Sequence, residues 1–146
     1  MTPTPRPRTL PTVIGPTENA LRALLVRLLA ATPLGSYEQW AALNLADRGA
    51  GDEPALVGAV ADGLATDVST ATGVLRALGD TGLLDRVDGT WRPSPAGAAL
   101  LTRVRAHVAE ATARVVDGLP EADVATAVRV LDHVRERAHA ELTRLT

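Results

Sequence analysis

The chain has 146 residues, a formal net charge of −2, no cysteine and 2% aromatic residues. The absence of cysteine excludes disulfides, thiol nucleophiles and thiolate metal sites. The sequence has neither an apolar run of membrane-spanning length nor a leader pattern at its start, so we expect a soluble, cytoplasmic protein without a membrane partner. With so few aromatic side chains, the core must be built from leucine, valine and alanine, which favours a mainly helical fold.

The first 35 residues predict a flexible arm followed by one helix. Residues 1–16 contain five prolines and few apolar side chains, a composition typical of an extended arm. Thr17 is a suitable N-cap, and Pro33 and Gly35 end the helix. The leucines between them recur every three or four residues, as on one helical face: Leu21, Leu24, Leu25, Leu28 and Leu29.

Three short helices are predicted over residues 36–79. Ser36 and Gln39 form a capping-box pattern at the start of the first. The second begins near Pro54, because proline is tolerated in the first turn of a helix. The third covers residues 68–79, and its inward positions are Ala71, Val74, Leu75 and Leu78.

The period of the pattern then changes from helix to hairpin. Residues 83–87 and 90–93 flank Asp88-Gly89, and this dipeptide between two strand segments is a strong hairpin signal. A two-residue turn gives a short hairpin.

Two long helices complete the predicted elements. Ser94-Pro95 begins the first, which extends to about residue 116, and Glu121 begins the second, which runs nearly to the end of the chain. Both carry narrow apolar seams that a chain of this size does not cover by itself. We therefore expect a homodimer joined through helices.

The predicted order of elements is that of a winged helix-turn-helix module, with the helix before the hairpin in the position that enters the DNA major groove. Three stretches also resemble the MarR family of bacterial transcription regulators: DVSTAT at 67–72, GLL at 82–84 and PSPAGAAL at 93–100. In that family the first opens the recognition helix, the second begins the wing and the third begins the first long dimerisation helix. The likeness extends from about Ser36 to Leu145.

The resemblance implies a mainly α fold in which a winged helix-turn-helix lobe with a short two-stranded hairpin is joined to long dimerisation helices. Residues 36–95 would form the winged helix-turn-helix lobe. Residues 17–35 and 96–146 would form the dimerisation lobe, and residues 1–16 the N-terminal arm. The family acts as homodimers that bind double-stranded DNA, regulate transcription and respond to a small organic ligand, so these partners are expected here, without a cofactor.

The resemblance also identifies candidate DNA-binding residues. By position, the recognition helix presents Ser69, Thr70, Thr72 and Arg76, while Arg86 and Arg92 flank the hairpin as candidates for phosphate contact. Hydroxyl groups contact phosphates or base edges, and an arginine pairs with guanine through two hydrogen bonds.

The charge distribution disagrees with tight DNA binding. Residues 36–95 hold four arginines against nine acidic residues, a net charge of −5, whereas a DNA-binding face is usually basic. Many family members have arginine where Gly73 stands, and longer basic wings where this chain has Asp88-Gly89. We therefore expect DNA binding that is weak and salt-sensitive, or lost.

In the family the ligand lies between the winged-helix lobe and the dimerisation helices. The residues at corresponding positions here are Tyr37, Trp40, Asn44, Arg103 and His107. An alternative function is a small-molecule-binding protein or an enzyme that uses this cavity, with His107 as its acid–base group. The three histidines share no metal-ligand spacing, so no metal site is expected.

Overall fold

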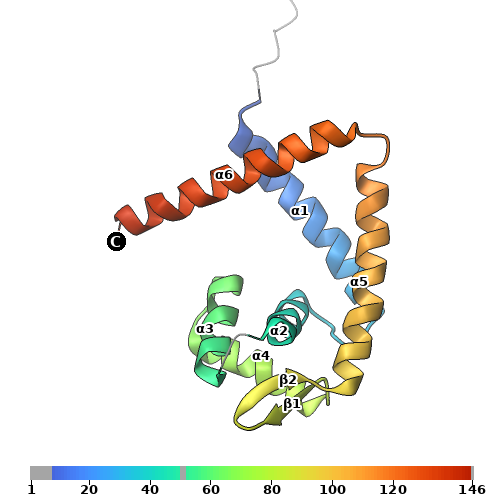
Figure 1. Ribbon diagram of the computed structural model, residues 1–146, viewed down its shortest axis with the longest axis vertical. Coiled ribbons are helices and arrows are strands. Elements are labelled where there is room, and N and C mark those ends of the chain that lie inside the picture. Colours follow the sequence, from blue (N-terminus) through green and yellow to red (C-terminus); the bar gives the residue numbers. More distant parts are fainter. Residues whose placement is uncertain (1–7, 50–51, 146) are drawn as a thin grey trace, which may run out of the picture. The chain divides into compact units, whose positions relative to one another are not determined.

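The computed structural model describes residues 8–49 and 52–145, which form six helices and one two-stranded antiparallel hairpin (Figure 1). In chain order the elements are α1 (Leu10–Leu29), α2 (Tyr37–Arg48), α3 (Glu53–Leu64), α4 (Val68–Asp80), β1 (Leu84–Val87), β2 (Thr90–Pro93), α5 (Pro95–Val116) and α6 (Glu121–Leu145). The chain divides into two compact units, Met1–Val108 and Ala109–Thr146, with the boundary inside α5. The predicted mainly helical fold with a short hairpin is confirmed.

The start of α1 differs from the sequence prediction. The helix begins at Leu10, so much of the expected arm is helical, and residues 1–7 of that arm lie outside the described residues. Pro11 is in the first turn, where its missing N–H has no helical partner to lose, and Pro16 removes only one internal hydrogen bond. Thr17 is not an N-cap: its hydroxyl lies inside the helix and donates to the Val13 carbonyl at 2.7 Å.

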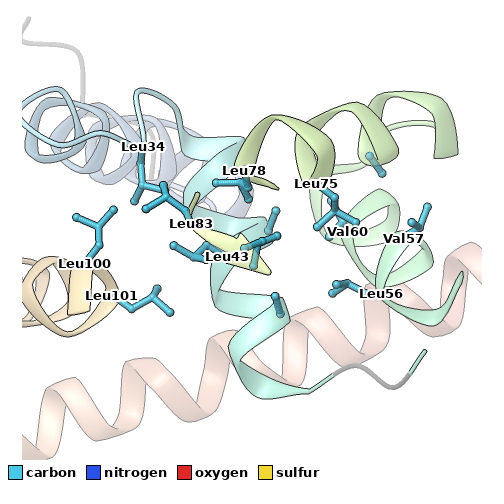
Figure 2. Close-up of a cluster of buried hydrophobic side chains, with 14 of the residues drawn as sticks. Leu34, Leu43, Leu56, Val57, Val60, Leu75, Leu78, Leu83, Leu100 and Leu101 are labelled. Carbon is cyan, nitrogen blue, oxygen red and sulfur yellow. The ribbon is translucent and has the colours of Figure 1, made fainter. Parts of the chain in front are cut away.

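The hydrophobic core of the first unit is built from leucine, valine and alanine, as the composition predicts. Side chains of α2, α3 and α4 meet those of the first turns of α5, and Figure 2 shows Leu43, Leu75 and Leu78 in the same cluster as Leu100 and Leu101. These five leucines are at most 3% exposed. This core fixes α4 and the hairpin, the two elements expected to contact DNA.

The starts of α2 and α3 agree with the sequence prediction, which placed a capping box at Ser36 and a helix start near Pro54. The Ser36 hydroxyl accepts a hydrogen bond from the Gln39 backbone N–H at 3.2 Å, at the start of α2. The Asp52 carboxylate accepts from the Ala55 N–H at 3.0 Å at the start of α3. Each of these bonds satisfies a backbone donor that has no partner within its helix, which is why both helices start at these positions.

The start of α5 is fixed against the residues that lead into the hairpin. The buried Ser94 hydroxyl donates to the Gly82 carbonyl at 2.6 Å and accepts from the Gly97 N–H at 3.0 Å. The Ser94 N–H in turn donates to the Leu83 carbonyl at 3.1 Å. The stretch that resembles the start of a family dimerisation helix is therefore a structural joint between the hairpin and α5.

The second unit consists of the last two turns of α5, a turn and α6. The turn contains Gly118, whose φ of 76° is in the left-handed region that favours glycine. None of the described residues of α6 is buried, and its apolar side chains include Val128 and Leu131 at 55% and 45% exposure. Much of the apolar seam read from the sequence is therefore exposed among the described residues of α6.

Candidate functional site: a DNA-reading helix, its wing and the α2–α5 contact

The outer face of α4 carries the predicted DNA-reading side chains. Ala71, Leu75 and Leu78 are buried on its inner face. Ser69 and Arg76 are exposed, and they lie on one side because they are seven residues apart, which is about two helical turns. Gly73 lies between them, and a Cβ added to it would meet nothing within 4 Å. The middle of this face is therefore flat, with one guanidinium at its C-terminal end.

Asp67 caps α4 and sets the chemistry of its first turn. Its carboxylate accepts the Thr70 N–H at 2.8 Å and the Thr70 hydroxyl at 3.1 Å. These two hydrogen bonds favour the charged form and hold the pKa of the Asp67 carboxyl below its ordinary value. The Thr72 hydroxyl likewise donates to the Val68 carbonyl at 2.7 Å. Both threonines therefore offer DNA an oxygen acceptor and a methyl group, because their hydroxyl hydrogens are already used.

The wing has the tight turn that the sequence predicts. Asp88 and Gly89 have φ values of 51° and 76°, so both central residues are left-handed, as two-residue hairpin turns of the primed type require. The register pairs Asp85 with Arg92 and Arg86 with Trp91. The wing is therefore short, and its tip bears a carboxylate.

The two wing arginines are in different environments. Arg86 forms an ion pair with Glu53 at the start of α3, and its guanidinium lies 5.5 Å from the centre of the Trp91 ring. Arg92 is exposed and has no ion pair with any described residue. Of the two predicted phosphate contacts, only Arg92 has an uncompensated charge within the described chain.

The residues predicted to bind a ligand do not converge as a group. Tyr37, Trp40 and Asn44 lie along one side of α2, and all three are partly buried. Of these three, Asn44 is contacted from α5 by Arg105, which donates to the Asn44 Oδ1 from its Nε at 3.1 Å and from its Nη2 at 2.8 Å. Its Nη2 also lies 2.8 Å from the Asp47 carboxylate.

Arg103 and His107 lie on other sides of α5. Each is two residues from Arg105, which is about 200° around a helix, so neither shares the side that meets Asn44. Both are exposed. The sequence did carry a signal for Arg105: it is one turn after the buried Leu101, while Asn44 and Asp47 are one turn apart on α2.

An open hollow of about 510 Å³ lies in the first unit, between the C-terminal end of α2, β2 and the start of α5. Its lining includes Asp47, Trp91 and Arg92, together with Ala46, Gly49, Leu56, Thr90, Pro93 and Ala98. The five predicted ligand residues are not among these. This pocket between the wing and α2 is therefore separate from the ligand site that the sequence predicted.

Two further properties concern metals and membranes. Within residues 8–49 and 52–145, no three histidine, aspartate or glutamate side chains are grouped so that they could hold a metal ion. Across the same residues, no helix combines the length and apolar character needed to span a bilayer.

The chain is similar in structure to MarR-family proteins, although no protein-family model matches its sequence and no curated protein is significantly similar to it. A MarR family protein from Bacillus stearothermophilus is 17% identical, with a TM-score of 0.76, and the match covers 89% of this chain and 93% of that one. A MarR family protein from Mycobacterium tuberculosis, solved in complex with DNA, is 23% identical, with a TM-score of 0.71 and coverage of 88% and 98%. CouR from Rhodococcus jostii RHA1, solved with p-coumaroyl-CoA bound, is 21% identical, with a TM-score of 0.70 and coverage of 86% and 91%.

These likenesses cover most of the chain and agree with the order of its elements, helices followed by a hairpin and two long helices. Together they show that the chain has the winged-helix fold of the MarR-family transcription regulators.

Proposed function

We propose that the protein is a transcription regulator that binds double-stranded DNA as a homodimer and responds to a small organic ligand. The observation that supports this most directly is the outer face of α4, where Ser69, Thr70 and Arg76 are exposed on a capped helix beside a short wing. A MarR-fold protein has been solved in complex with DNA. A recognition helix next to a wing is the arrangement with which winged-helix proteins enter the major groove.

In this proposal the residues of α4 and the wing have separate roles. Arg76 pairs with guanine through its two parallel N–H groups, while Thr70 and Thr72 accept from base amino groups or contact thymine methyl groups. Ser69 contacts the backbone or a base edge, and Arg92 contacts a phosphate. Binding is weak at physiological ionic strength because few cations are available and the surrounding segment is acidic. It falls further as salt rises, because it depends on ionic contacts with phosphate.

The homodimer is inferred from exposed apolar side chains on the long helices. In α1, Leu21 and Leu24 are 47% and 37% exposed, and only Leu29 is buried. In α6, Val128 and Leu131 are similarly exposed. Apolar stripes of this length are uncommon on the surface of a monomer, and a second copy of the chain would cover them.

The ligand is proposed to be a small organic molecule held beside α2. Tyr37 and Trp40 supply aromatic surface there, while the Asn44 side chain is held by Arg105 and by its own hydrogen bond to the Trp40 carbonyl at 2.8 Å. Arg105, rather than Arg103 or His107, is the α5 side chain that contacts Asn44. CouR, which has the same fold, was solved with p-coumaroyl-CoA.

Electrophoretic mobility shift at low salt, against the DNA upstream of its own gene, tests the proposal. A regulator retards this DNA at micromolar dimer, and a matching ligand releases it. Absence of retardation at low salt would contradict the proposed regulator function. A fluorescence titration with a Trp91→Phe variant, in which Trp40 is the remaining tryptophan, reports ligand binding beside α2 separately.

A second function is favoured by the charges alone. Residues 36–95 have a net charge of −5, and Arg86 and Arg105 are compensated by Glu53 and Asp47. These observations fit a MarR-like fold that has lost most DNA binding and works as a small-molecule-binding protein or an enzyme. Ligand binding at Trp40 without any retardation of DNA would support this second function over the first.

A further inference from the structure

Glu53, the first residue of α3, contacts two side chains of the wing at once. One of its carboxylate oxygens pairs with the Arg86 guanidinium, and the other accepts a hydrogen bond from the Trp91 indole N–H at 3.3 Å. Arg86 and Trp91 are cross-strand partners, so they lie side by side on one face of the hairpin. The Arg86 guanidinium also lies over the Trp91 ring. A single carboxylate thus connects the wing to α3.

The Trp91 ring of this contact also packs against α4. A Cβ added to Gly79 would lie 2.9 Å from two atoms of the Trp91 ring, so the indole packs directly on the backbone of α4. The Glu53 side chain is 28% exposed, against 55% for Arg86. Because the carboxylate is partly shielded from water, its attraction for the guanidinium is screened less than in a fully exposed pair.

This geometry has a consequence for DNA binding. Affinity for the phosphate backbone depends on how many uncompensated cations a protein brings to it, since each contact releases counterions from the DNA. Arg86 is one of only two arginines on the hairpin strands, and its charge is compensated by Glu53. The wing therefore brings less positive charge to DNA than its sequence suggests.

We propose that Glu53 is a positioning residue that fixes the wing against α3 and withholds Arg86 from the DNA backbone. The charge of residue 53 then sets how strongly the wing binds phosphate. This role rests on the proposed DNA-binding function. It adds to that function a carboxylate, outside the recognition helix, that lowers the affinity for DNA. As an acidic residue in the first turn, Glu53 also interacts favourably with the dipole of α3, but the cap of that helix is supplied by Asp52.

The test is Glu53→Gln, measured by fluorescence anisotropy with a short labelled duplex of arbitrary sequence between about 50 and 200 mM salt. Glutamine keeps an oxygen acceptor for the Trp91 indole but removes the charge that holds Arg86. We expect affinity to rise on the order of tenfold at 50 mM salt, and the plot of log affinity against log salt to become steeper by about 0.9, the value for one additional phosphate contact. Non-specific DNA suffices, because this effect does not depend on base sequence.

Asp62→Asn is the matched control. It changes the net charge by the same amount and lies on the same helix, and Asp62 has no ion pair with any described residue. We expect it to leave the salt slope unchanged. Arg86→Ala is expected to reduce affinity more in the Glu53→Gln background than in the parent, which shows that the freed arginine makes the new contact.

The outcomes separate the two proposals. If the parent binds DNA and Glu53→Gln binds equally well or more weakly, the proposed role of Glu53 is wrong, and the proposed regulator function is unaffected. Binding by Glu53→Gln but not by the parent supports the role of Glu53 and contradicts the regulator function of the natural chain. If neither protein binds at low salt, both proposals are wrong.

Discussion

Gly97 at the start of α5 lies directly against the backbone of Leu83, at the entry to the wing. A Cβ added to Gly97 would be 2.0 Å from the Leu83 carbonyl oxygen and 3.0 Å from its carbonyl carbon. The same carbonyl accepts the Ser94 N–H, so the two segments are joined by a hydrogen bond and by close backbone packing. The orientation of α5 relative to the hairpin is therefore set by a position that only glycine can occupy.

Replacement of Gly97 by alanine should prevent this joint from forming. The contact is with backbone, which cannot move aside as a flexible side chain does, so we expect a loss of more than about 3 kcal/mol of folding stability or failure to fold. Urea unfolding followed by far-ultraviolet circular dichroism measures it. Gly73→Ala is the matched control, because its Cβ has open space in a helix interior and should raise stability by roughly 0.5–1 kcal/mol. Equal, small effects at both glycines would contradict the close packing at Gly97.

Much of the fold follows from local patterns whose partners are close in sequence. Ser36 and its bond to the Gln39 N–H lie within one turn, and the same is true of the caps at the start of α3 and α4. The Asp88-Gly89 turn is equally local, because its left-handed conformation depends on those two residues. Patterns of this kind depend little on distant parts of the chain, so the starts of the short helices and the hairpin turn could be predicted from the sequence.

The predicted start of α1 was wrong because the high proline content of residues 1–16 was taken to exclude a helix, whereas the effect of each proline depends on its position in the helix. Pro11 fits the first turn of a helix, and Pro16 interrupts only one hydrogen bond, so the prolines did not mark a boundary. The positions of the two prolines in the helix, not their number, therefore decide where α1 begins.

The site was harder to predict because its contacts join distant parts of the chain. Glu53 and Arg86 are 33 residues apart, and Asn44 and Arg105 are 61 residues apart. A sequence pattern identifies which residues share a helix face, but it does not say which face meets a neighbouring element. The sequence therefore grouped Arg86 with Arg92 and did not distinguish their environments, and it did not identify Arg105 as the α5 side chain that contacts Asn44.

The carboxylate of Asp67 gives α4 a predictable acid sensitivity. Its pKa is lowered mainly by the hydrogen bond from the Thr70 N–H, so the charged form is favoured in the folded protein. Its contribution is therefore fully present above the unfolded carboxyl pKa of about 4 and is lost as pH falls through the lower folded pKa. Asp67→Asn keeps a capping oxygen but does not titrate. The parent should be more stable than this variant at neutral pH, and the gap should close below about pH 4.

Urea unfolding of both proteins at neutral and acidic pH measures this gap. Thr70→Val, which removes the hydroxyl donor but keeps the backbone N–H, should reduce the acid sensitivity without abolishing it. A gap between the parent and Asp67→Asn that stays constant over the pH range would contradict the role of the cap.

If the protein is the proposed homodimer, one face of α6 is covered in solution. Leu131→Glu places a charge on the apolar face that includes Val128, and burying this charge against a partner would be costly. The dimer of this variant should therefore dissociate at a higher protein concentration than the parent dimer, or not form at all. Light scattering coupled to size-exclusion chromatography measures the mass. Ala140→Glu adds the same side chain nine residues later, half a turn around the helix, and should leave the dimer intact. A monomeric parent would contradict the dimer itself, and equal dissociation of both variants would contradict this choice of face.

Arg76 should determine sequence preference more than overall affinity. It is the one arginine of α4, it is exposed, and it has no ion pair with any described residue, so its paired N–H groups are available to a guanine. Arg76→Ala should cost about 1–3 kcal/mol on a selected operator and relax the preference at one base pair. Arg76→Lys should keep non-specific affinity but lose most of that preference, because an ammonium group cannot form the paired contact. Arg92→Ala is the matched comparison, expected to weaken all sequences alike and to lower the salt slope by about 1. Titration of each variant against an operator and a scrambled duplex separates these outcomes, and a uniform loss for Arg76→Ala would assign it to the phosphate backbone instead.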